Sequence, residues 1–404
     1  MFSNKKSWLI AGPIGVAALL VAVWFAVLGW WSGVFAVFGI VGVCFGIVTA
    51  WGAKAQESRK EPVEFARVPA PTPPPAPADS ETLVDAMLRT SRYGLLLRPQ
   101  IRANLTPAQV NHAEEQLNQE MARVGSGMVA VGRYGHVTQG PESEEGPVAN
   151  GPDFQRVDDF YLDCCAVTNA QFAAFVHDGG YADETLWDSE VWQAVPDFID
   201  RSGHSGPRNW ESGMPRQGEE QLPVVGISWY EASAFARWAG KRLPTNAEWE
   251  KAGSCPVEVG AGTVKQRRYP WGEAMDRSRA NIWGSTTGGP GGAPTSVNEY
   301  TKGACAGGIN QLIGNVWEWT ADEFFGGPDQ PGLILPNPMR SIRGGAFDTY
   351  FDNQATCQFQ SGESPMSRKH NIGFRCVVSA ADLAVADNEL TPEHVNAEEN
   401  EVLA

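Results

Sequence analysis

The segment GNVWEW at residues 314–319 constrains the fold strongly, because it sets two large aromatic side chains on either side of one acid. On an extended strand, successive side chains point to opposite faces, so Trp317 and Trp319 would share one face while Glu318 points to the other. Such a strand buries a large apolar area on one side and offers a carboxylate to something on the other. We expect the rest of the domain to be organised around it.

Local signals around this segment predict short helices and short strands. Three capping boxes, each a hydroxyl followed three residues later by Glu or Gln, predict helices that begin after Thr168, Ser228 and Thr245. Glycines predict that these helices end at Gly179-Gly180, Gly240 and Gly253. Alternating or apolar runs predict strands at 160–162, 224–227 and 373–378. Together with 44 glycines, 28 prolines and 15 tryptophans, these signals indicate an α+β fold with much irregular chain.

The N-terminal part predicts a membrane anchor. Residues 7–53 carry no charged side chain, and one bilayer crossing needs about 20 apolar residues. We expect a cytoplasmic N-terminus at 1–7 and two transmembrane helices within 8–53, near 8–30 and 34–52. Lysine and arginine flank both ends of this hairpin and are absent from its connection, so the positive-inside rule places both ends, and the soluble domain, in the cytoplasm. Small residues at every fourth position favour either packing of the two helices on each other or docking on another membrane protein.

The next segments predict a spacer and a helical lead-in. Residues 54–83 contain seven prolines between Pro62 and Pro77, which is typical of a semi-rigid linker. Within 84–126, Thr106-Pro107 predicts a helix start, and an apolar stripe from Val110 to Val124 predicts a helix that ends at Gly125. The main domain spans 127–380. The tail at 381–404 is acidic, without lysine or arginine, and we expect it to be disordered.

Composition excludes some classes of function. A net charge of −16 argues against a nucleic-acid partner, since phosphate binding needs clustered Lys and Arg. The seven cysteines have no CxxC spacing, and the six histidines lack the spacings of metal catalysis. Ser228 has a capping role and does not lie on a GxSxG turn.

Seven blocks between residues 127 and 380 carry a specific resemblance. They are DFYLDCCAVTNAQFAAFV, LPVVGISWYEASAFARWAGKRLPTNAEWEKAG, RYPWG, ANIW, GINQLIGNVWEWTAD, RSIRGGAF and NIGFRCVV. In this order they resemble the formylglycine-generating enzyme, or sulfatase-modifying-factor, family. The resemblance implies a loop-rich variant of the C-type lectin fold. It also implies a relationship to enzymes that convert a sulfatase cysteine to formylglycine with O2 and copper, and to oxidases, sulfoxide-synthase partners and ligand-binding proteins.

The resemblance implies that the copper chemistry is lost. Members that use copper have two cysteines, five residues apart, after the RGG motif. This chain has Thr349 and Gln354 at those positions, and neither can supply the thiolate that Cu(I) prefers. Cys357 lies three residues beyond the second position, which still leaves one ligand short.

The resemblance also implies two calcium sites, of which the first lacks its acid. One would use Asn281 and the carbonyl of Ile282. The other would use Gln311, the carbonyls of Gly314 and Val316, and the carboxylate of Glu318. Oxygen ligands suit Ca²⁺, but hydrogen bonds from loop amides would explain Glu318 equally well.

Two functions of different classes remain open. The first is a non-catalytic binding or assembly subunit, tethered to the lipid bilayer, that stabilises an integral-membrane protein complex; Trp317, Trp319 and Arg343 are its candidate binding residues. Arg343 and Arg375 could instead tie loops together. The second is an oxidative protein-maturation enzyme that acts without the copper pair. The segments 184–216 and 324–338 could either line or cover the groove in which a ligand would bind.

Overall fold

The computed structural model describes residues 80–138, 153–260, 262–285, 292–305, 307–324 and 338–385. The predicted membrane hairpin at 8–53, the linker up to residue 79 and the tail from residue 386 lie outside this part of the chain. Among the described helices, none has the length and apolar character needed to cross a bilayer.

The lead-in segment is a small bundle of helices followed by a strand. Its elements are α3 (Ser80–Arg89), α4 (Tyr93–Leu96), α5 (Pro99–Arg102), α6 (Pro107–Glu120) and β1 (Met121–Val124). The start of α6 is as predicted, with a reciprocal capping box between Thr106 and Gln109. The predicted helix end at Gly125 is wrong. Met121 and Val124 lie in β1, because pairing with the next strand outweighs the helical spacing of their side chains.

Four small sheets make up the β structure. Their strand orders are β1-β5-β12, β10-β9-β8-β11, β2-β4 and β3-β7-β6. The remaining strands are β2 (Gly127–Val131), β3 (Gly135–Thr138), β4 (Asp153–Val157), β5 (Phe160–Asp163), β6 (Val257–Gly260), β7 (Thr263–Gln266), β8 (Trp317–Glu323), β9 (Arg340–Arg343), β10 (Gln360–Glu363), β11 (Ile372–Gly373) and β12 (Val377–Ser379). All pairs are antiparallel except β11 with β8.

The three predicted helices of the main domain are present. They are α7 (Asn169–His177), α8 (Trp229–Trp238) and α9 (Asn246–Ser254), and each begins with the predicted capping box. Short 3₁₀ helices add η1 (Glu184–Leu186), η2 (Trp192–Asp197), η3 (Thr301–Gly303), η4 (Asp352–Gln354) and η5 (Ala380–Asp382).

The end of α9 differs from the prediction. Gly253 lies within the helix, and the residue that leaves it is Cys255, in the left-handed conformation with φ 45°. Gly253 has a packing reason instead, since a Cβ there would lie 3.0 Å from the Cys357 sulfur.

Two strand predictions also need correction. Residues 224–227 form no strand; Val224 donates to the Val167 carbonyl and Gly226 to the Lys369 carbonyl, so the segment is pinned by separate partners rather than by a ladder. The predicted strand at 373–378 is split into β11 and β12, and Phe374 and Cys376 between them are fully buried.

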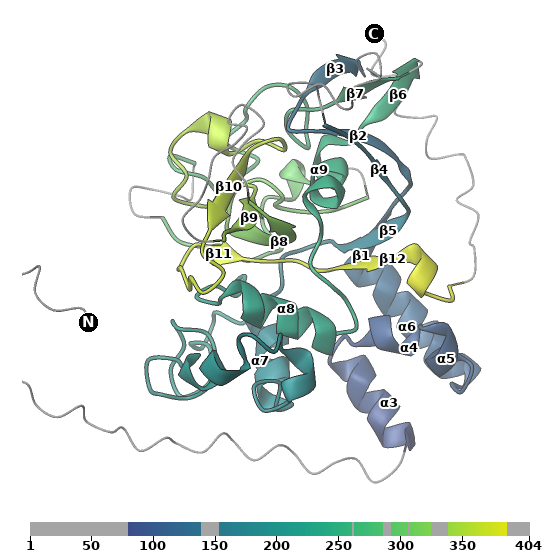
Figure 1. Cartoon of the computed structure of the whole chain (residues 1–404), viewed down its shortest axis with the longest axis vertical. Helices are drawn as coiled ribbons and strands as arrows, with labels where there is room; N and C mark the ends of the chain where they lie inside the picture. Colours follow the sequence, from purple (N-terminus) through teal and green to yellow (C-terminus); the bar gives the residue numbers. More distant parts are fainter. Residues whose placement is uncertain are drawn as a thin grey trace, which may run out of the picture. The chain divides into compact units, whose positions relative to one another are not determined.

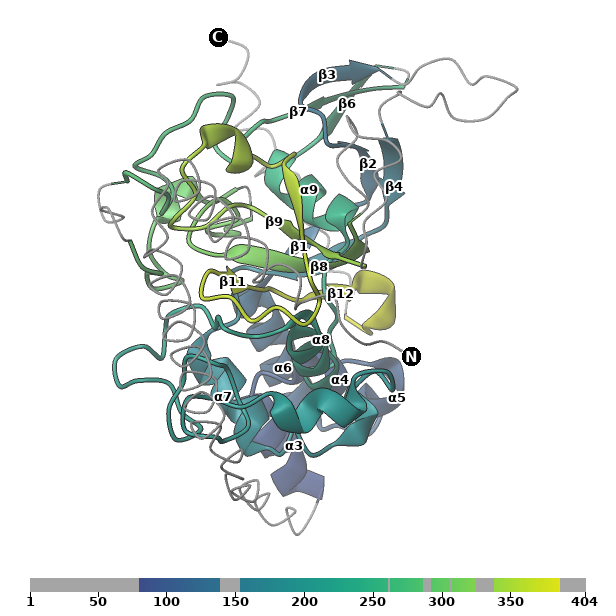
Figure 2. The same ribbon diagram turned by 60° about the vertical axis from the view of Figure 1, so that its left-hand side comes forward.

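Strand β8 separates two parts of the core, as its sequence predicts. Trp319 is buried, with Trp317 packed beside it, in an aromatic cluster with α7 and α8. Glu318 points the other way, where Trp249 of α9 donates to its Oε2 at 2.7 Å. Figures 1 and 2 show α7 and α8 on one side of β8 and α9 on the other.

Candidate functional site

The two family cysteine positions lie in the loop after β9, and their side chains do not suit copper. Thr349 is 5 % exposed, and its hydroxyl accepts from the Ala346 N–H at 2.8 Å, which closes a turn. Gln354 ends η4 and is partly buried. Cys357 is fully buried, with its sulfur against Gly253 of α9. A hydroxyl and an amide supply no thiolate, so the described residues do not fit Cu(I) at this position.

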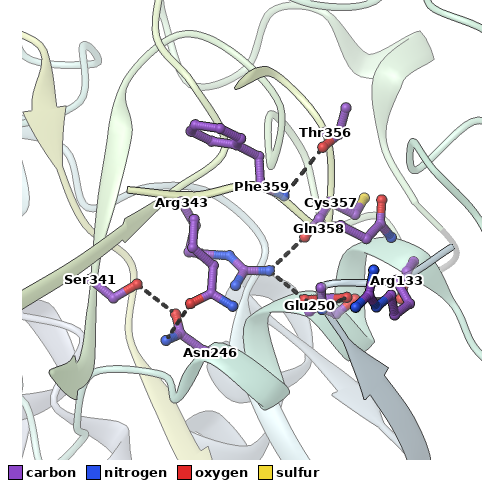
Figure 3. Close-up of polar contacts among 12 residues, drawn as sticks. Arg133, Asn246, Glu250, Ser341, Arg343, Thr356, Cys357, Gln358 and Phe359 are labelled. Atoms are coloured by element: carbon purple, nitrogen blue, oxygen red, sulfur yellow. Dashed lines mark hydrogen bonds and ion pairs between the residues drawn. The ribbon is translucent and has the colours of Figure 1, made fainter. Parts of the chain in front are cut away.

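Arg343 lies inside the protein and holds this loop to α9 (Figure 3). Its Nη2 donates to Glu250 Oε2 and to the Cys357 carbonyl, both at 2.6 Å. Glu250 also accepts from the Gly132 N–H at 2.9 Å. Burial raises the pKa of Glu250 to about 7, although Arg343 acts in the opposite direction. Arg343 is 0 % exposed, so it ties loops together and cannot reach a partner at the surface.

The two candidate binding tryptophans differ in access. Trp319 is 0 % exposed and belongs to the interior, whereas Trp317 is partly exposed and its ring lies 6.1 Å from that of Phe359. Of the three residues assigned to binding from the sequence, only Trp317 reaches the surface.

Glu318 is committed to Arg375. The guanidinium donates to both carboxylate oxygens at 2.8 Å, and to the carbonyls of Asp163 at 2.9 Å and Asn310 at 2.8 Å. Trp249 supplies a further donor to Glu318. A carboxylate that accepts from a guanidinium and an indole in this way does not suit a Ca²⁺ site.

Amides occupy the position of the other expected calcium ligands. Asn281 donates to Asn315 Oδ1 at 3.1 Å, and Asn315 donates to Gln311 Oε1 at 2.7 Å. The backbone carbonyls of Asn281, Ile282 and Gly314 already accept from backbone N–H groups. Of the side-chain oxygens of Asn281, Asn315 and Gln311, that of Asn281 is buried without a hydrogen-bond partner among the described residues. The side-chain oxygens of Asn315 and Gln311 already accept from neighbouring amides, and neither carries a charge, so this donor set does not fit Ca²⁺.

The structure instead presents a groove made of two adjoining hollows. The larger has a volume of about 990 Å³ and the smaller about 260 Å³, and both are lined by Arg201, Asn209 and His370. The larger hollow is also lined by Asp197, Ile199, Asp200, Arg208, Gly226, Met366, Ser367, Arg368 and Lys369. The smaller is completed by Asn169, Arg216, Glu219, Leu222, Pro223, Val225, Gly292, Ala293, Pro294 and Phe347. Residues 197–216 therefore line the groove, one of the two alternatives that the sequence left open.

Hydrogen bonds fix the wall formed by residues 197–213. Asp200 accepts from the N–H groups of Ser202 and Gly213 at 2.7 Å and of His204 at 3.0 Å. Burial acts to raise the pKa of Asp200, but these donors outweigh it and leave the pKa below its ordinary value.

Arg368 joins that wall to the opposite side of the groove. It donates to the carbonyls of Ile199, at 3.0 Å, and Gly206, and forms an ion pair with Glu231 at 3.0 Å. The groove is therefore shaped before any ligand binds.

The groove is basic in an acidic protein. Five basic side chains and three acids line the two hollows, whereas the whole chain has a net charge of −16. Within the part of the chain that the structure describes, no ion pair joins Arg201, Arg208 or Arg216 to a carboxylate, and all three are exposed. These arginines are free to meet an anionic group.

One neutral side chain packs closely into the wall of the groove. Asn209 Oδ1 is buried against Gly226, where a Cβ would lie 2.3 Å away, and it has no hydrogen-bond partner among the described residues. Sequence reasoning named one side of this groove, within 184–216, but missed the opposite side, because that side comes from a segment about 160 residues away; the signal available there was the basic run Arg368-Lys369-His370.

Comparison with known proteins gives relatives of several kinds. The formylglycine-generating enzyme of Thermomonospora curvata is 32 % identical over 279 residues, which is 58 % of this chain and 86 % of the relative. The inactive C-alpha-formylglycine-generating enzyme 2 of Bos taurus is 30 % identical over 283 residues, 61 % of this chain and 86 % of the relative. Hercynine oxygenase of Mycobacterium tuberculosis is 39 % identical over 190 residues, 45 % of this chain. The match spans only 42 % of that enzyme, less than half of its length.

PvdO from Pseudomonas aeruginosa matches with a TM-score of 0.39 and 20 % identity, over 64 % of this chain and 93 % of its own. Residues 106–380 match the family described as the sulfatase-modifying factor enzyme 1-like domain. That match covers well over half of the chain and includes every block singled out above, so the chain belongs to the family of sulfatase-modifying factor enzyme 1-like domains, which contains both enzymes and proteins named as inactive.

Proposed function

We propose that this domain is a non-catalytic binding module that holds an acidic segment of a partner protein in the groove. The observation that supports this proposal is that a preformed basic groove occurs in a domain whose two family cysteine positions hold a hydroxyl and an amide side chain. A site without thiolates has no ligands for Cu(I), whereas exposed arginines pair well with carboxylates.

The chemistry of the groove favours a peptide as the ligand. Arg201, Arg208 and Arg216 supply donors for side-chain carboxylates. The exposed side chains of Ile199 and Met366 add apolar contact at the wall. An extended acidic peptide meets both requirements.

The membrane part of the proposal comes from the sequence. The charge-free run at 8–53 would anchor the chain in the bilayer, and the linker at 54–83 would hold the domain near integral-membrane proteins. The partner would then be a subunit of a membrane complex that the domain assembles or stabilises. The relative named as inactive shows that one member of this family lacks the enzyme activity.

A binding experiment tests the groove. The full chain in detergent is titrated with a fluorescent glutamate-rich peptide and, separately, with a lysine-rich peptide of equal length. Arg201→Glu with Arg208→Glu should weaken binding of the acidic peptide roughly 5- to 30-fold, since each exposed pair contributes about 0.2–1 kcal/mol and reversal also adds repulsion.

Arg89→Glu with Arg156→Glu is the matched control, because both arginines are exposed, on α3 and β4, and neither lines the groove. The control should bind the acidic peptide as the wild type does. Equal loss in both variants, or tighter binding of the lysine-rich peptide, would overturn the proposed ligand class.

The alternative is an oxidative protein-maturation enzyme that does without the copper pair. It is favoured by relatives named as a formylglycine-generating enzyme and a hercynine oxygenase. Metal analysis of the purified full chain, together with O2 consumption in the presence of a cysteine peptide, distinguishes the two functions. Stoichiometric copper or iron with O2 uptake would replace the binding module by the enzyme.

A further inference from the structure

The residue that ends α9 is an unusual one for its conformation. Cys255 has φ 45° and ψ 62°, the left-handed region in which helices usually end on glycine or asparagine. A side chain with a Cβ is strained there, and such strain persists only where the surroundings hold it in place. The cysteine side chain therefore has a role that glycine could not fill.

The surroundings of Cys255 contain a second thiol. The side chains of Cys255 and Cys305 are hydrogen-bonded to each other, and both pack in the core cluster beside α9. The Cys255 sulfur also donates to the Ala252 carbonyl at 3.6 Å, so Cys305 is the donor in the bond between the two thiols. This contact places the two sulfurs side by side, as closure to a disulfide requires.

The two thiols differ in access. Cys255 is partly exposed, whereas Cys305 is 6 % exposed and sits in the turn closed by its N–H to the Ile309 carbonyl. A disulfide in solution can reach the partly exposed Cys255 sulfur and not the buried Cys305 sulfur, so the geometry makes Cys255 the first nucleophile and Cys305 the thiol that follows. The hydrogen bond to Cys255 and, after it, burial raise the pKa of Cys305.

The other thiols lack this arrangement. Cys164 and Cys165 are neighbours in sequence, and Cys165 donates to the Val297 carbonyl at 3.4 Å. Cys357 and Cys376 are fully buried, the first against Gly253 and the second with its pKa raised by burial and by Asp163. Cys255 and Cys305 thus combine a partly exposed sulfur with a hydrogen-bonded partner behind it.

We propose that Cys255 and Cys305 form a redox-active dithiol that closes to an intramolecular disulfide on reaction with a small disulfide such as oxidised glutathione. The Cys255 thiolate attacks one glutathione sulfur, the S–S bond of glutathione breaks, and the first glutathione leaves as a thiolate that takes up the proton lost by Cys255. Cys305 then loses its proton and attacks the Cys255 sulfur, and the second glutathione leaves and is protonated. Two protein thiols are oxidised and one glutathione disulfide is reduced to two thiols.

The disulfide would fix the end of α9 to the loop that leads into β8. Asn310 in that loop accepts from Arg375, and its N–H donates to the Cys164 carbonyl, so the loop already belongs to the centre of the fold. The covalent link would join positions about 50 residues apart in sequence, a separation at which cross-links restrict the unfolded chain strongly. Oxidation should therefore raise the melting temperature.

The test is disulfide mapping of the purified full chain. After incubation with oxidised glutathione, remaining thiols are alkylated and the chain is digested without reduction. We expect a cross-linked peptide pair that contains Cys255 and Cys305, loss of two titratable thiols, and a higher melting temperature that dithiothreitol reverses. The reaction should accelerate as pH rises, because the thiolate is the nucleophile.

Variants separate the pair from its neighbours. Cys305→Ser should leave Cys255 as a mixed disulfide with glutathione, and Cys165→Ser, the matched control at another partly exposed thiol, should leave the cross-link intact. Cys255→Gly should fold well, since glycine relieves the left-handed strain, and should lose the cross-link. A cross-link that maps to Cys164–Cys165, or a wild-type protein that keeps both thiols or stops at the mixed disulfide, would overturn the proposal.

Discussion

Removing the Arg375 guanidinium should reveal how much the buried ion pair with Glu318 contributes to stability. Arg375→Met keeps much of the side-chain volume but removes five hydrogen bonds, two of them to the carboxylate. Among the residues that the structure describes, the Trp249 indole would then be the one donor left to the buried Glu318 side chain. Breaking a buried pair from one side costs about 3–5 kcal/mol, because an uncompensated charge remains in the interior.

The loss of unfolding free energy should be measured by urea unfolding of the full chain in detergent, and the change in melting temperature by thermal unfolding. Tryptophan fluorescence follows both transitions. At roughly 2–4 °C per kcal/mol for a domain of this size, the melting temperature should fall by about 10 °C. Adding Glu318→Gln to Arg375→Met should recover part of the loss, since the second change removes the uncompensated charge.

A matched exposed pair provides the comparison. Arg237 and Asp188 lie 2.6 Å apart, with 38 % and 32 % of their side chains exposed. Arg237→Met should cost no more than about 1 kcal/mol. If Arg375→Met costs as little as Arg237→Met, or if Glu318→Gln makes the double variant worse rather than better, the interpretation of Arg375 as the central tie of the fold is refuted.

Three further predictions follow from contacts described above. Gly253→Ala should stabilise α9 by about 1 kcal/mol in a Cys357→Ala protein but not in the wild type, because the Cys357 sulfur lies 3.0 Å from the added Cβ. An equal shift in melting temperature in the wild type and in the Cys357→Ala protein would contradict this. Asp200→Asn should reduce stability and acidic-peptide binding near neutral pH. Folding lowers the pKa of Asp200, so the stability that its carboxylate contributes is present above the unfolded pKa of about 3.9 and is lost as pH falls through the folded pKa. A difference in stability between variant and wild type that persists well below about pH 3 would argue against this role of the carboxylate. Thr349→Cys with Gln354→Cys should bind Cu(I), measured by competition with a chromogenic chelator, while either single variant should not; equal binding by the singles would show that these are not the paired positions.

Local rules predicted the parts of the fold that depend on neighbours in sequence. The capping boxes at Thr168, Ser228 and Thr245 were read correctly because each involves residues three apart. The alternation along β8 likewise assigned Trp319 and Glu318 to opposite sides. Side-chain periodicity and capping need no information about distant segments.

Errors arose where a distant segment decides the local conformation. The expected end of α9 at Gly253 is wrong because Cys357 packs on that glycine, and the helix ends instead at Cys255, next to Cys305. The helical stripe that runs into Met121 is cut short because β5 offers a strand partner. No pattern within either segment carries that information.

The candidate site was the least predictable part. Arg343 was considered both for binding and for tying loops, and its partner Glu250 decides for the second. The groove depends on Arg368, which contacts carbonyls at Ile199 and Gly206 across more than 160 residues of sequence. The resemblance located the cysteine positions, but the basic side chains of the two walls come together only in the folded chain.

The sheet around β5 has a mechanical consequence. Strand β1, which follows the lead-in helices, pairs with one edge of β5, and β12, near the end of the described chain, pairs with the other. The Ala384 N–H, beyond β12, also donates to the Leu97 carbonyl. The start of β1 lies beside Asp163 and the end of β12 beside Phe160, at opposite ends of β5. Tension applied between residues 80 and 385 would therefore load these three strands in shear, so that the hydrogen bonds of both ladders resist it together.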